Sequence, residues 1–294
     1  MAALRDIQNK IAAVKKTRQI TRAMNMVAAA RLRQVQERTE RFRPYAEKFA
    51  EVLGSLSEGL DAEAHPLLAQ PETVDRVGLI FITADRGLCG SFNMNLILKA
   101  QQFLTENKSA GKEVAFYAVG RKGIEFFRRR KVEFAEQMPG AMNVVDFDLA
   151  TQVARMGLNA FLAGEVQEVY MIYSRFESII SQVPTVEKLL PISPEMAGEA
   201  AEDDGAGLEY LTEPSAAEIL VDLLPRYLNV RVYSGLLETS TSENAARMAS
   251  MDNATKNCKE LIQNLTQAFN KARQAAITAE LMDIVGGAEA LKSG

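Results

Sequence analysis

The sequence has no tryptophan, one histidine, two cysteines and few aromatic residues, which make up 7% of its 294 residues. One histidine and two scattered cysteines do not form a zinc-binding set, and no acidic cluster has the spacing of a calcium loop. Cys89 and Cys258 lie in different segments, which argues against a structural disulfide and for reduced packing residues. The sequence therefore indicates a cytoplasmic protein that needs no metal or other cofactor.

Long apolar runs are also missing. The longest strongly apolar stretches, such as residues 77–82, are far shorter than the roughly 20 residues that span a bilayer. The amino terminus lacks the continuous apolar segment of a secretory signal. Because 47% of the residues are apolar, the chain can still bury a core. We therefore expect a soluble, folded protein without direct membrane insertion.

Proline is absent from residues 226–294, so a helix there meets no interruption from this residue. Apolar and small residues recur in this segment at alternating steps of three and four, at Met248, Met251, Thr255, Cys258, Ile262, Leu265, Phe269, Ala272 and Ala276. This spacing is the seam of a coiled coil, along which one helix packs against another. It predicts a C-terminal coiled-coil helix over residues 209–294.

A partner helix is predicted over residues 1–60. Its apolar stripe keeps the same spacing and then resumes after a slip, at Leu4, Ile7, Ile11 and Val14, then Ile20, Met24 and Val27. Each stripe alone would be marginal in water, so we expect the two ends of the chain to pack against each other, antiparallel. The middle of the chain must then be an inserted domain.

The central residues alternate between strand and helix patterns. Residues 77–83, 114–119 and 166–173 are rich in β-branched and aromatic residues, and residues 92–107 and 145–162 are helix candidates. This alternation predicts a three-layer α/β domain over residues 75–190, with parallel strands joined by crossover helices.

The end of this domain carries two further predictions. Residues 181–189 read as an antiparallel edge strand, and residues 191–208 read as a flexible acidic loop with five acids and no base. The expected fold class is therefore α/β, with a long antiparallel coiled coil of the N- and C-terminal helices around an inserted three-layer α/β domain.

Acidic residues are missing from residues 7–36, although the whole chain has a net charge of −4. The ionisable side chains in that segment are Lys10, Lys15, Lys16, Arg18, Arg22, Arg31 and Arg33. Such a surface suits nucleic acid, an anionic membrane or an acidic protein. Overall acidity weakens the first alternative and the poor apolar face weakens the second, so we favour an acidic protein partner. A nucleic-acid tether would bind with a steep salt dependence.

An enzyme built on the α/β layer is the other alternative. The turn at residues 85–90 follows a strand and precedes a helix, but its glycine spacing fits neither the dinucleotide loop nor the phosphate loop. A Cys89 nucleophile would need His65, which precedes a proline in a linker. The basic run at residues 128–131 is better explained as the end of a helix, where cations are favoured. No catalytic constellation emerges.

Four stretches of the sequence resemble one family. They are IAAVKKTRQITRAMNMVAAAR at residues 11–31, DRGLCG at 85–90, SENAARMASMDNAT at 242–255 and ITAELMDIVGGAEAL at 277–291. In this order they closely resemble the gamma subunits of F-type ATP synthases, and the resemblance covers the whole chain. Ser91 and Cys258 depart from the usual family residues, and the cysteine-bearing insertion of photosynthetic relatives is missing, which argues against thiol control.

The resemblance implies a central rotary shaft that couples ion-driven rotation of a c-ring to ATP synthesis, or reverse hydrolysis, and regulates ATPase activity and proton flow. One copy would stand inside a sleeve of alpha and beta subunits, with its α/β foot on epsilon and the c-ring. Catalysis would belong to beta, and this chain would be a non-catalytic subunit. The complex would lie peripherally at the cytoplasmic face of a bacterial inner membrane.

The resemblance also assigns contact residues. It puts Met24 beside a beta contact and Arg247 in a matching arginine–methionine motif. The residues expected where the upper shaft meets the sleeve are Arg273, Gln274, Thr278 and Glu280. Tyr210 and Glu213 are expected near the c-ring and epsilon.

Overall fold

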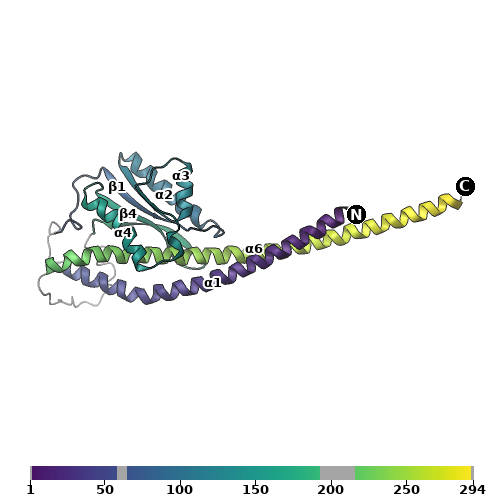
Figure 1. Ribbon diagram of the computed structural model, residues 1–294, viewed down its shortest axis with the longest axis horizontal. Coiled ribbons are helices and arrows are strands. Elements are labelled where there is room, and N and C mark those ends of the chain that lie inside the picture. The colour runs from purple at the N-terminus through teal and green to yellow at the C-terminus, as the bar shows by residue number, and fades with distance from the viewer. Residues whose placement is uncertain (1, 58–64, 193–215, 293–294) are drawn as a thin grey trace. The chain divides into compact units, whose positions relative to one another are not determined.

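The computed structural model describes residues 2–57, 65–192 and 216–292 (Figure 1). Its helices are α1 (Ala2–Ser57), α2 (Phe92–Ser109), α3 (Arg121–Arg129), the short 3-10 helix η2 (Ala141–Asn143), α4 (Phe147–Leu162) and α6 (Ala216–Lys292). Its strands are β1 (Arg76–Ile82), β2 (Glu113–Val119), β3 (Glu136–Met138), β4 (Glu168–Phe176) and β5 (Gln182–Leu190). The chain divides into two units, residues 29–247 and residues 1–28 with 248–294.

The unit of residues 29–247 is built on one sheet with the strand order β3-β2-β1-β4-β5. All neighbouring pairs are parallel except β4 and β5, which pair antiparallel. The predicted parallel strands and the antiparallel edge strand are therefore confirmed, with ends that differ from the prediction by three residues at most. The sequence did not predict β3, which has three residues and no apolar alternation.

Helices cover both faces of this sheet. Alternate residues of β1 point to opposite faces, so Leu79 and Phe81 pack with α2 and α3, whereas Ile80 and Ile82 pack with α4. The second face also carries the parts of α1 and α6 that belong to this unit, which bury side chains such as Leu53. Figure 1 shows these layers. The predicted fold class is confirmed.

Both long helices contain a proline, Pro44 in α1 and Pro225 in α6. A proline inside a helix removes one backbone hydrogen bond and costs about 3 kcal/mol. Around Pro225 the helix buries Leu224 and Leu228 almost completely. This burial offsets the lost hydrogen bond. Tertiary packing therefore keeps the helix continuous at Pro225, although proline has a low helix propensity.

The unit of residues 1–28 and 248–294 is an antiparallel pair of helix segments. The hydroxyls of Thr21 and Thr255 lie 2.8 Å apart, and the Asn25 side-chain amide donates to the Met248 carbonyl at 2.8 Å. All nine seam residues predicted in α6 are buried or half-buried, and most of the residues between them are exposed. The predicted coiled-coil seam of α6 thus agrees with the structure.

The predicted seam of α1 is wrong after Val14. Ile20 and Val27 are 60% and 57% exposed and face away from the pair. The three-four spacing instead continues without a slip, and its further positions are Arg18, Thr21, Asn25 and Ala28. A rule based on apolar residues misses these positions because two of them pair by hydrogen bonds and one is a small alanine.

We expect the Asn25→Ala variant to loosen this pair. Loss of this partly buried hydrogen bond costs about 1 kcal/mol, which raises local opening roughly fivefold. Amide hydrogen exchange around residues 248–255 should therefore become faster. Asn9→Ala, at an exposed position on the same helix, is the control. Equal exchange in the two variants would contradict the seam role of Asn25.

No helix in the described ranges has the length and apolar character needed to cross a bilayer.

Candidate functional site

Asp85 ties together three loops at one end of the sheet. It follows β1, and its Oδ1 accepts hydrogen bonds from the backbone N–H groups of Arg121 and Gly140, each at 2.8 Å. Arg121 begins α3 just after β2, and Gly140 lies just after β3. A single buried carboxylate therefore holds the carboxyl ends of three neighbouring strands in place.

The turn after Asp85 is also held by α6. Arg247 donates to the backbone carbonyls of Arg86 and Gly87 at 3.3 to 3.4 Å, and its guanidinium pairs with Glu243 at 2.6 Å. Both side chains of this ion pair are about nine-tenths buried. Burial raises the pKa of Glu243, and the Arg247 guanidinium opposes that rise. Arg247 is therefore an anchor inside this unit.

Cys89, in the same turn, is a packing residue. Its thiol is buried, and the Asn93 amide donates to Sγ at 3.2 Å. Burial raises the pKa of the thiol, so the nucleophilic thiolate is disfavoured at neutral pH. This environment does not suit cysteine catalysis.

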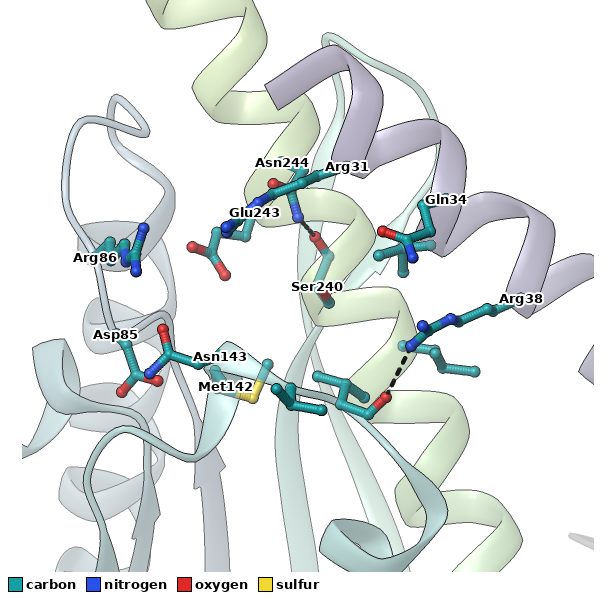
Figure 2. A pocket seen from close by; sticks show the side chains of 14 residues that line it. Arg31, Gln34, Arg38, Asp85, Arg86, Met142, Asn143, Ser240, Glu243 and Asn244 are labelled. Atoms are coloured by element: carbon teal, nitrogen blue, oxygen red, sulfur yellow. Dashed lines mark hydrogen bonds between the residues drawn. The ribbon is translucent and has the colours of Figure 1, made fainter. Parts of the chain in front are cut away.

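A polar cleft of about 270 Å³ opens beside this turn, between α1, α6, the loop after β1 and the segment around η2. Figure 2 shows the side chains that line it. The labelled polar residues are Arg31, Gln34, Arg38, Asp85, Arg86, Asn143, Ser240, Glu243 and Asn244. Arginine side chains thus share the lining with carboxylate and amide groups. The whole lining belongs to the unit of residues 29–247.

The other unit carries five of the predicted contact residues. Met24 is half-buried on α1, beside the seam. The remaining four are exposed along α6, at Arg273, Gln274, Thr278 and Glu280. The structure therefore brings Arg247 to the turn at residues 85–90 but leaves these five on the paired helices. Tyr210 and Glu213 lie outside the described residues.

The α6 helix extends past its partner in this unit. The pairing of Thr21 with Thr255 and of Asn25 with Met248 brings the start of α1 opposite about residues 271–274, since both helices rise equally per residue. Beyond that point α6 has large apolar side chains that are about half exposed or more, at Ile277, Leu281, Met282, Ile284 and Val285. This end of α6 presents an apolar surface that α1 does not cover.

The roles of two residues that hold the turn at residues 85–90, Glu243 and Asp85, were not predicted from the sequence. Glu243 was not assigned as the partner of Arg247, although a glutamate four residues before an arginine on a helix is a recognisable pairing signal. The role of Asp85 had no such signal, because its two donors are far along the chain.

Comparison with known proteins identifies the family. The model of the ATP synthase family matches residues 3–291. The chain is 51% identical to the ATP synthase gamma chain of Maridesulfovibrio salexigens and 54% identical to that of Syntrophobacter fumaroxidans, over 99% of this chain and 100% of each relative.

The chain belongs to the ATP synthase gamma-chain family.

Solved structures show the same fold as this gamma-family chain. A chain in the structure of the Euglena gracilis mitochondrial ATP synthase, with OSCP, F1 and c-ring, aligns over 100% of this chain and 96% of its own length, with a TM-score of 0.70 at 22% identity. A chain in the central stalk and c-ring structure of the Tetrahymena thermophila mitochondrial ATP synthase aligns over 80% of this chain and 99% of its own, with a TM-score of 0.59 at 25% identity.

Proposed function

We propose that this chain is the central rotary shaft of an F-type ATP synthase, and that it couples rotation of a c-ring to catalysis on beta subunits. The observation that carries this proposal is the paired-helix unit, in which α6 runs past α1 and presents an exposed apolar end. A shaft needs such an end to sit inside a sleeve without being covered by its own chain.

The proposed partners follow from this role. The exposed end of α6, with Arg273, Gln274, Thr278 and Glu280, would contact the sleeve of alpha and beta subunits. The basic face of α1 around Met24 would meet acidic loops of beta through exposed charge pairs, which contribute roughly 0 to 1 kcal/mol each and so can break and reform on rotation. Its exposed Ile20 and Val27 would add apolar contacts.

The α/β unit would serve as the foot. We assign residues 75–190 to this foot and place Tyr210 and Glu213 next to epsilon and the c-ring. The predicted acidic loop of residues 191–208 lies outside the described residues from residue 193 on. The similarity to chains in structures that contain a c-ring supports this assignment. We propose one non-catalytic copy per complex, held peripherally at the cytoplasmic face of a bacterial inner membrane.

Reconstitution tests the proposal. Alpha and beta subunits from the same organism are purified with and without this chain, separated by size exclusion and assayed for ATP hydrolysis. We expect one complex that contains all three subunits and turns over ATP much faster than alpha and beta alone. No joint complex, or nucleic acid bound by the chain with a steep salt dependence, would contradict the shaft role.

Removal of residues 277–294 should uncouple the complex without unfolding the foot. The removed side chains that the structure describes are mostly exposed, so the unfolding midpoint of the foot should change little. The sleeve contacts would be lost, so ion pumping per ATP hydrolysed should fall. The measurement is ion transport and ATP turnover in the same vesicles. An unfolded foot, or unchanged pumping per ATP, would contradict this expectation.

A further inference from the structure

Two residues that line the cleft beside the Asp85 turn each have a buried side-chain oxygen that lacks a hydrogen-bond partner in the described parts of the chain. The two oxygens are Oδ2 of Asp85 and Oδ1 of Asn244, and these residues are 8% and 6% exposed. An unpaired buried acceptor is costly, and most so when it is charged. An occupant of the cleft should therefore bring hydrogen-bond donors.

The charges of the side chains around the cleft favour an anionic occupant. Arg31, Arg38 and Arg86 line it, and none of them has an ion-pair partner within 4.0 Å among the described residues. Glu243 also lines the cleft, but its charge is balanced by the ion pair with Arg247, so Asp85 is the carboxylate left to set against these three arginines. The local balance is two positive charges, which favours a divalent anion and disfavours a metal cation.

An oxyanion that keeps one proton meets the charge requirement and brings a donor for one of the two acceptors. We propose that this cleft binds inorganic phosphate as hydrogen phosphate. Its unprotonated oxygens accept from the arginines, for which planar guanidinium donors are well suited. Its P–OH group donates to the free oxygen of Asp85. Sulfate and phosphodiester headgroups carry no proton at neutral pH, so Asp85 repels them. This proposed oxyanion site does not depend on the proposed shaft role.

Calorimetric titration of the full-length chain with sodium phosphate, at constant ionic strength, tests the site. Sodium sulfate, a soluble phosphodiester and magnesium chloride are titrated in parallel. We expect binding of phosphate and at least roughly tenfold weaker binding of sulfate, the ratio for one charge-assisted hydrogen bond. Binding of magnesium alone, equal binding of sulfate, or no binding of phosphate would overturn the proposal.

The Asp85→Asn variant gives the sharpest test, because it replaces the repelling oxygen by an amide donor. Phosphate should bind at least roughly tenfold more weakly, and the preference over sulfate should disappear. If this variant unfolds, Arg31→Gln at an exposed position should weaken phosphate binding by itself. Arg33→Gln is the matched control, since its side chain is 84% exposed, pairs with Glu37 and does not line the cleft. Equal effects of the last two variants would show unspecific anion binding and overturn the site.

Discussion

The Arg247→Ala variant should lower the free energy of unfolding of the α/β unit by about 3 to 5 kcal/mol. The substitution leaves the Glu243 carboxylate buried without its partner and removes the donor to the carbonyls of Arg86 and Gly87. All seven tyrosines lie within residues 29–247 and the chain has no tryptophan, so the tyrosine near-ultraviolet signal during urea unfolding reports on this unit.

The loss of stability in the Arg247→Ala variant should depend on pH. Burial already raises the pKa of Glu243, and removal of Arg247 takes away the group that opposes the rise. An acid with a raised pKa in the folded state favours folding when it is protonated, so stability falls as the pH rises from the unfolded pKa towards the folded one. The deficit of Arg247→Ala should therefore be smaller at pH 5 than at pH 8.

A double variant distinguishes the contribution of the ion pair to stability from the contribution of side-chain packing. Glu243→Gln combined with Arg247→Met removes both charges and keeps much of the volume, so it should recover part of the lost stability. A deficit in Arg247→Ala that is below about 1 kcal/mol, the range of exposed pairs, would contradict the anchoring role.

The Gly120→Ala variant should destabilise the same unit by about 4 kcal/mol, from backbone strain and overpacking together. Gly120 precedes α3 with φ 94° and ψ 135°, a conformation that side chains with a Cβ rarely adopt. An added Cβ would lie 1.9 Å from the carbonyl oxygen of Thr83, a buried residue that follows β1. Backbone must move to relieve that contact.

Gly164→Ala is the control for this prediction. Gly164 also has a positive φ, 73°, but an added Cβ would meet nothing within 4 Å. It should show only the conformational cost of about 1 to 2 kcal/mol. Urea unfolding of both variants measures the difference, and equal losses would show that the contact with Thr83 does not matter.

The sequence by itself determined the layered α/β unit and the seam of α6. In both cases each residue's own apolar character marks its place, because strands between two helical layers are buried along most of their length, and helices bury every third or fourth residue. The antiparallel edge strand β5 also follows from such a pattern. The resemblance to the gamma-chain family could also be found in the sequence, because its signatures are contiguous stretches of residues.

The tertiary structure decided the polar positions. Thr21 and Asn25 belong to the seam of α1 because partners across the pair satisfy their hydrogen bonds, which no periodicity rule on apolar residues detects. Asp85 joins loops that are 36 and 55 residues away in the chain, and it also lines the polar cleft. Most buried polar groups have a hydrogen-bond partner, and the place of that partner is a property of the three-dimensional structure.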